Sequence, residues 1–196
     1  MICLNCSKFS LKAICDSCKN SYLKPKITYR EVGNLEVISF FEYLAISDFI
    51  KSKYKINGYR IYKYFAKEFF APFIKSYKSN INTPIYLIGV DEDIQRGFSN
   101  VAILTHFASK LSDTKALHNS LIAKNRVIYA GKSLEFRLNN PRNFKYNGLS
   151  DIEAILIDDV VTTGLTLQEA NRILKKSGVN IHFALTLANA KDGIDY

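Results

Sequence analysis

Two adjacent carboxylates, Asp158 and Asp159, directly follow the apolar run of residues 154–157. Two valines come next, and then a turn leads into a helical pattern; the turn consists of Thr162, Thr163, Gly164, Leu165 and Thr166. This order predicts a buried parallel strand followed by a loop at a helix N-terminus. Such a terminus suits a phosphate because its first N–H groups are unpaired and lie at the positive end of the helix dipole. The acids would repel that anion, but they accept hydrogen bonds from vicinal hydroxyls. The segment therefore favours a ribose 5-phosphate site.

Residues 154–166 closely resemble the phosphoribosyl pyrophosphate (PRPP) motif of type I phosphoribosyltransferases. The resemblance implies that Asp158 and Asp159 are the catalytic acids, which hold the ribose hydroxyls directly or through Mg2+. It also implies that residues 162–166 bind the 5-phosphate. The alternative is a buried strand capped by Asp, with Thr and Gly serving only the turn. That alternative does not explain two acids followed by a glycine between hydroxyl residues.

Four cysteines near the N-terminus form two C-x2-C pairs that are eight residues apart: Cys3, Cys6, Cys15 and Cys18. Two such pairs can place four thiolates tetrahedrally at about 2.3 Å from a zinc ion, although iron also occupies sites of this kind. About 20 residues have too little apolar surface to fold without a metal. We expect a closed structural zinc site, with four reduced structural or redox thiols as the alternative.

The composition indicates one globular unit with a small appendage. The chain has 196 residues, of which 47% are hydrophobic, enough for one good core. No apolar run approaches the ~18 residues of a membrane span, and the N-terminus lacks the pattern of a signal peptide. We therefore expect a cytoplasmic protein, in which disulfides are rare.

The positive charge is concentrated in the first part of the chain. Residues 1–80 contain 14 Lys and Arg against 6 Asp and Glu, whereas residues 81–196 contain 13 against 12. This asymmetry favours a polyanionic partner for the first part.

We expect residues 1–35 to form the zinc module and a linker, with residues 21–35 as a linker or short hairpin. Residues 36–196 would then form the main domain, which begins with a basic helical segment, 36–80. Within that segment an apolar face recurs at helical spacing (Ile61, Phe65, Phe69 and Phe73), and Pro72 predicts a kink or break near Ala71.

Basic and aromatic residues of this segment could follow a phosphate backbone and stack on unpaired bases. An ordinary solvated basic face is the alternative. The candidate residues for binding single-stranded DNA are Lys53, Lys55, Arg60, Lys63, Tyr64, Lys67 and Lys75.

Residues 81–190 alternate between strand and helix patterns, which predicts an α/β fold with a parallel sheet and helices on both faces. Ligands of such sheets bind beyond the carboxyl ends of the strands, so the loops after Val90 and Ile157 should lie together. The three histidines (His106, His118 and His182) show no metal or triad spacing.

Nearly the whole chain resembles the ComF family of competence-associated phosphoribosyltransferase-like proteins. The resemblance rests on the four cysteines, on the Lys-Tyr segment of residues 53–58, on Arg96-Gly97-Phe98, on residues 137–140 and on the PRPP motif. It implies a role in natural transformation, with PRPP and single-stranded DNA as ligands. A helicase or an inner-membrane channel would be a partner.

The same resemblance assigns further roles. The loop after Val90, with Arg96, would receive pyrophosphate, and residues 126–145 would form a mobile cover whose anion contact is Arg137. The chain departs from the family in two places: Ser99-Asn100 replaces Asn-Gln, and residues 91–93 are all acidic. Three acids beside pyrophosphate are unfavourable unless Mg2+ bridges them. PRPP binding is thus better supported than turnover. A metabolic phosphoribosyltransferase for a base or amine and a non-catalytic PRPP-binding adaptor remain alternatives.

Overall fold

The computed structural model describes residues 1–92, 98–127, 129 and 132–190. Its centre is a six-stranded sheet in the order β1-β2-β8-β7-β3-β4. The strands are β1 Thr28–Val32, β2 Leu35–Glu42, β3 Ile85–Gly89, β4 Lys115–Ala116, β7 Ile152–Val161 and β8 Val179–Asn189. Every neighbouring pair is parallel except β1 and β2, which form an antiparallel hairpin. The predicted α/β fold with a mostly parallel sheet is confirmed.

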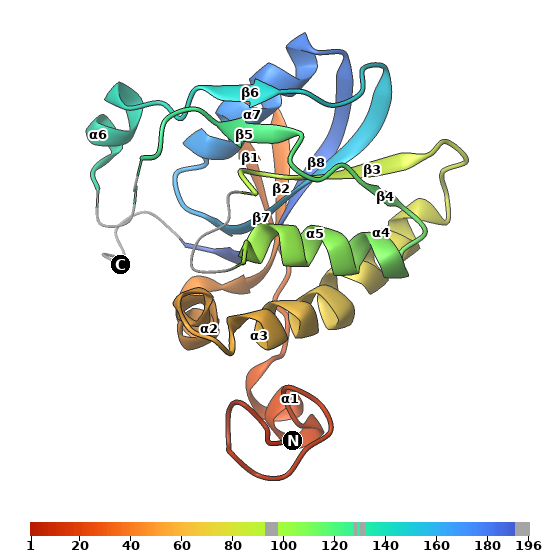
Figure 1. Cartoon of the computed structure of the whole chain (residues 1–196), viewed down its shortest axis with the longest axis vertical. Helices are drawn as coiled ribbons and strands as arrows, with labels where there is room; N and C mark the ends of the chain where they lie inside the picture. The colour runs from red at the N-terminus through yellow and green to blue at the C-terminus, as the bar shows by residue number, and fades with distance from the viewer. Residues whose placement is uncertain (93–97, 128, 130–131, 191–196) are drawn as a thin grey trace.

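Helices cover both faces of the sheet (Figure 1). One face packs against α2 Tyr43–Lys51, α3 Gly58–Phe65, α4 Ala71–Lys78 and α5 Asn100–Leu111. The other face packs against α7 Leu165–Lys176 and a second, two-stranded sheet of β5 Leu121–Ala123 and β6 Phe144–Tyr146. The short helix α6 Leu134–Asn139 lies between β5 and β6 in the chain, within the segment expected to cover the site.

The sheet brings the site elements to one edge. In parallel strands all carboxyl ends lie on the same side, so β3 and β7, which pair directly, place the loops after them together. The register aligns Gly89 with Ile157, and Val90 N–H donates to the carbonyl of Ile157. The ends of the two predicted strands are thus adjacent as expected, but β7 continues to Val161, so the residues after Ile157 extend the strand and do not form a loop.

The segment of residues 36–80 is helical after β2, as expected, and its apolar face is buried. Phe65 and Ile61 are almost fully enclosed, while Phe73 packs at the edge of the core. Between α3 and α4 the residues Ala66–Phe70 form a π-helical turn, and α-helix resumes at Ala71. Pro72 has no N–H to donate to the preceding turn, which accounts for this change of helix type at the expected place.

Of the two forms expected for residues 21–35, the structure shows a hairpin. Strands β1 and β2 pair from Thr28 with Ser39 to Val32 with Leu35, and Gly33 turns the chain with φ +62°. Before it, helix α1 Asp16–Tyr22 contains Cys18, and Cys15 caps the N-terminus of this helix. The hairpin extends the sheet beyond β8, so part of this segment belongs to the central sheet.

Candidate functional site

The two carboxylates of the motif lie in the last part of β7. Successive residues of a strand point to opposite faces, and Asp159 follows Ile155 and Ile157 toward the helices α2–α5. Its Oδ2 accepts hydrogen bonds from Lys53 Nζ at 3.0 Å and from Asn100 Nδ2 at 2.7 Å. Asp159 is 8% exposed, so this carboxylate is held by a nearly buried ion pair. Asn100 was not among the predicted site residues.

Asp158 differs from its neighbour in surroundings and charge. Its Oδ1 accepts a hydrogen bond from the Asp159 N–H at 2.7 Å. The residue keeps some surface open to solvent, although protein surrounds the carboxyl group. Burial, and then the charge of Asp159, raise the pKa of Asp158 well above its usual range. Because like charges this close disfavour double ionisation, the pair tends to keep one proton.

The loop after β7 depends on Gly164 in two ways. This residue is the N-cap of α7 and has φ +84°, a conformation that side chains disfavour. A Cβ placed there would also lie 2.5 Å from Cγ1 of Val32 in β1. Glycine therefore allows the loop to press against the hairpin while it turns into α7, so that the first N–H groups of the helix face the loop.

Arg30 of β1 holds the same loop from the side. Its Nη1 donates to the carbonyl of Thr162 at 2.6 Å, and its Nη2 donates to the carbonyl of Thr163 at 3.3 Å. Since the C=O and N–H of a planar trans peptide point in opposite directions, this grip turns the following N–H groups away from Arg30. The sequence carried no signal for this role, because 132 residues separate Arg30 from Thr162.

Arg137 reaches the loop from the cover segment. Its Nη1 donates to Thr162 Oγ1 at 2.5 Å, and its Nη2 donates to the carbonyl of Tyr129 at 3.0 Å. No carboxylate in the described part of the chain pairs with this guanidinium. Arg137 thus brings a positive charge beside the hydroxyl of Thr162, where the 5-phosphate was expected.

A cleft of about 550 Å3 begins at this point and runs along α7. Tyr129, Arg137 and Leu138 line one side of it, and Leu165 lies where the helix begins. The outer face of α7 adds three exposed cations, which are Arg172, Lys175 and Lys176. With Arg137, four cations line the cleft against one acid among the described residues, Glu169, whose carboxylate accepts from the N–H groups of Arg142 and Asn143.

The acids after β3 are already neutralised within the fold. Asp91 accepts from Arg142 Nη1 and from the N–H of Ala123. Glu92, 2% exposed, accepts from His118 and from the N–H of Asn119. The hydrogen bond that His118 donates to Glu92 raises the pKa of His118. Both carboxylates are thus paired with partners within the protein, while the unfavourable effect of residues 91–93 on pyrophosphate stays a prediction. Asp93 and Arg96, the expected pyrophosphate contact, lie outside the described residues.

Three segments that were singled out separately in the sequence meet at the acid pair. The turn that carries Lys53 packs against Phe98, which precedes Asn100 by two residues. A Cβ at Gly58 would overlap the carbonyl oxygen of Ser52 and would lie 2.8 Å from Cζ of Phe98. Glycine at this position lets the Lys-Tyr segment close against the start of α5, where both donors to Asp159 arise.

Two residues of the expected DNA surface lie elsewhere. Lys53 faces Asp159 in the acid site. Tyr64 is 7% exposed and lies in the core next to the four-cysteine module, so its ring is not available to a base. Burial raises the pKa of Tyr64, with Glu68 adding to the effect. The apolar face of α3 is wider than its sequence suggested, because the module covers the turn that carries Tyr64.

The other basic residues remain accessible to different degrees. Lys63 and Lys67 place their ammonium groups over the ring of Phe107, at 4.7 and 5.9 Å from its centroid. Tyr59 packs edge-on against the same ring. Lys55 and Lys75 are exposed, and Arg60 reaches toward the carbonyl of Ile2 in the module. Part of the expected set thus forms one basic and aromatic patch over α3, the π-helical turn and α5.

The four cysteines lie close together. Their Sγ atoms are all within 4.8 Å of one another, and those of Cys6 and Cys15 are 3.8 Å apart. In a tetrahedral site with Zn–S bonds of about 2.3 Å the sulfurs are ~3.8 Å apart, so the donor set fits zinc. Burial opposes ionisation of Cys3, yet backbone N–H groups, with that of Cys15 foremost, lower the pKa of Cys3 to about 6. A thiolate is the form that binds metal.

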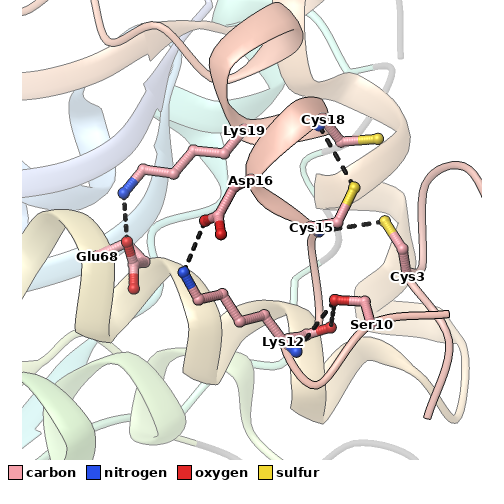
Figure 2. Close-up of polar contacts among 8 residues, drawn as sticks. All are labelled: Cys3, Ser10, Lys12, Cys15, Asp16, Cys18, Lys19 and Glu68. Carbon is pink, nitrogen blue, oxygen red and sulfur yellow. Dashed lines mark hydrogen bonds and ion pairs between the residues drawn. The ribbon is translucent and has the colours of Figure 1, made fainter. Parts of the chain in front are cut away.

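The cysteine module is joined to the helices by both charge and packing. Lys19 of α1 forms an ion pair with Glu68 of the π-helical turn (Figure 2). Cys3, Ile14 and Leu23 belong to the same continuous core cluster as Phe65. The module therefore shares the core of the main fold.

No helix in the described ranges is both long enough and apolar enough to span a membrane.

Comparisons with known proteins find structures but no sequence relatives. No protein-family model and no curated protein matches the chain. An adenine phosphoribosyltransferase shares 8% identity over 89% of this chain and 98% of its own, with a TM-score of 0.43. A hypoxanthine phosphoribosyltransferase from Staphylococcus aureus shares 17% over 65% and 62%, with a TM-score of 0.39. UMP synthase from Leishmania donovani shares 13% over 66% of this chain, which spans only 22% of that protein, with a TM-score of 0.38. These TM-scores lie below 0.5, so function is inferred from the residues of the site itself.

Proposed function

We propose that the loop and acid pair at the end of β7 bind PRPP. The observation that carries this proposal is the combination at one strand end of Asp158 and Asp159 with a loop that Arg30 braces at the N-terminus of α7. Carboxylates suit the ribose diol, and the helix terminus suits the 5-phosphate.

Each residue then has a distinct task. Asp159 accepts from a ribose hydroxyl, and Asp158, with its raised pKa, can donate as well as accept. The N–H groups of residues 163–166 meet the phosphate, while Arg137 adds a charge-assisted hydrogen bond to it. The pyrophosphate supplies oxygen ligands of the kind that Mg2+ prefers, and Mg2+ bound there would stabilise the charge of the departing pyrophosphate.

Calorimetric titration of PRPP with Mg2+ into the wild type and the double variant Asp158→Asn/Asp159→Asn tests the proposal. We expect saturable binding by the wild type and at least about a tenfold loss in the variant, worth ~1.4 kcal/mol. Asp151→Asn is the matched control, since Asp151 lies exposed at the opposite end of β7 and its φ of +56° is tolerated by Asn. A folded wild type without PRPP binding would overturn the proposal.

We further infer, from the resemblance to the ComF family, a cytoplasmic role in natural transformation. The protein would bind incoming single-stranded DNA and contact a helicase or inner-membrane channel. Support from the structure is the patch of Tyr59, Lys63, Lys67 and Phe107, which joins positive charge to aromatic rings. The division expected from the sequence assigns residues 1–35 to the zinc module and linker and residues 36–196 to the phosphoribosyltransferase-like domain, although β1 of the first part pairs with β2 in the central sheet.

A metabolic phosphoribosyltransferase is the second candidate, favoured by the same ribose-phosphate site. Turnover of PRPP with a base or amine, measured as pyrophosphate release and unaffected by DNA, would support it over the first. Tight PRPP binding with pyrophosphate release at the background rate would instead support a non-catalytic adaptor.

A further inference from the structure

The carboxylate of Asp159 already forms an ion pair with a lysine side chain of the protein. Lys53 Nζ lies 3.0 Å from Asp159 Oδ2, and the two side chains are only 26% and 12% exposed. The charge of Asp159 is the main cause that raises the pKa of Lys53, so the ammonium stays protonated in its partly buried position. Water screens this pair far less than it screens a surface salt bridge.

Both hydrogen bonds to the Asp159 side chain from Lys53 and Asn100 go to the same carboxylate oxygen. Oδ2 takes both donors, Lys53 Nζ and Asn100 Nδ2, which match its two lone pairs. Oδ2 is therefore committed to the protein, so a ligand hydroxyl would approach the carboxylate at Oδ1.

The position of Lys53 is built into the fold. Its turn, Ser52–Tyr54, is closed by the Lys55 N–H on the carbonyl of Ser52, and Gly58 allows the turn to pack on Phe98. Asn100 begins α5 two residues after Phe98. The same packing thus delivers both donors to Asp159, although Lys53 is 106 residues away in sequence.

We propose that Lys53 is the resident counter-ion of the acid pair, takes the place of a divalent cation at Asp159, and aligns that carboxylate to accept directly from a vicinal diol. A divalent cation on the same carboxylate would lie within a few ångströms of the ammonium and be repelled by it. Lys53 is a positioning residue, since it acts through Asp159. The inference rests on the proposed PRPP site and decides between direct and metal-mediated recognition of the ribose hydroxyls.

Ribose 5-phosphate is the first probe, because it has the diol and the phosphate but no pyrophosphate to bind Mg2+. We expect the wild type to bind it equally in Mg2+ and in EDTA. Lys53→Met should bind at least about tenfold more weakly in EDTA and regain affinity when Mg2+ is added. Lys53→Arg should keep the behaviour of the wild type. A structural defect alone would not create this dependence on Mg2+.

Lys51→Met is the matched control, because Lys51 is an exposed lysine two residues from Lys53 and belongs to no site described above. It should behave as the wild type. Equal affinity of Lys53→Met and the wild type in EDTA would overturn the proposal, as would a wild type that requires Mg2+ to bind ribose 5-phosphate.

Mn2+ binding to the ligand-free, zinc-loaded protein, followed by electron paramagnetic resonance, supplies a test without ribose. Lys53→Met should gain one Mn2+ site that Lys53→Met/Asp159→Asn lacks, while the wild type should have none. The double variant carries no unpaired buried charge and serves as the folded reference. If the Mn2+ result holds but no ribose ligand binds the wild type, Lys53 is the counter-ion and the PRPP proposal fails. A wild type that binds Mn2+ through Asp159 overturns the role of Lys53.

Discussion

Single residues decide whether the loop after β7 can form. Gly164 combines a positive φ with a Cβ position that Val32 already occupies, and Arg30 fixes the carbonyls just before it. Both features come from the β1 hairpin, so a strand near the start of the chain shapes a loop near its end.

Gly164→Ala should therefore weaken PRPP binding by at least about tenfold and destabilise the fold by about 1–3 kcal/mol. Gly178→Ala is the control, because Gly178 follows the same helix with φ +77° but an added methyl carbon would come no closer than 3.4 Å to non-neighbouring atoms. The control should lose stability only because alanine disfavours a positive φ, and it should keep its PRPP affinity. Calorimetry and thermal denaturation measure the two effects, and equal affinities of the two variants would contradict the role assigned to the Val32 contact.

At the scale of elements, positive charge lies on two separate helical surfaces. One is the patch over α3 and α5, continued by Lys75 on α4, and the other is the outer face of α7 along the cleft. The concentration of charge in residues 1–80 pointed only to the first. The second arises because Arg172, Lys175 and Lys176 recur on one face of α7, beside a cover segment that adds Arg137.

Charge reversal distinguishes the two surfaces. Lys63→Glu/Lys67→Glu/Lys75→Glu should weaken single-stranded DNA binding by at least about tenfold. It should also reduce the slope of log affinity against log salt by about 2, as expected for three lost phosphate contacts. The matched variant Arg172→Glu/Lys175→Glu/Lys176→Glu changes the net charge equally and should leave binding nearly unchanged. Fluorescence anisotropy across a salt series measures both, and the reverse ranking would place the DNA along α7.

At the scale of the whole molecule, the cysteine module and the α/β fold behave as one packed body. Cys3, Cys18 and Leu23 share a core with Phe65, and Lys19 pairs with Glu68. A metal that orders the module therefore also stabilises the helices beneath it, because buried apolar area on both sides depends on their contact.

Removal of zinc should lower the melting temperature of the full chain by several degrees. A loss of about 2 kcal/mol corresponds to ~4–8 °C for a protein of this size. Cys6→Ser provides a second route, since Cys6 is exposed and its loss removes a ligand without opening a core cavity. Metal analysis and thermal denaturation with and without chelator should show one zinc per chain in the wild type. A chain that contains no zinc and melts unchanged would contradict the assignment.

The sequence by itself determined which chemical groups lie close together along the chain. The acid pair, the Thr-Gly loop and the four cysteines are contiguous or closely spaced patterns, in which covalent connection keeps the groups together. The α/β class followed in the same way from alternating strand and helix periods. The burial of Ile61 and Phe65 could also be predicted, because helical spacing determines which residues share a face.

Only the tertiary structure decided which distant residues complete these patterns. Lys53 and Asn100 at Asp159, Arg30 at the phosphate loop, and His118 at Glu92 are contacts between segments that the sequence shows as unrelated. Tyr64 illustrates the converse, because the module buries a ring that its own helix would leave open. Side-chain direction across a sheet and between layers depends on strand order and packing. Neither is encoded in local spacing. The residues that pair with the acid site and brace the phosphate loop are therefore brought together only when the whole chain is folded.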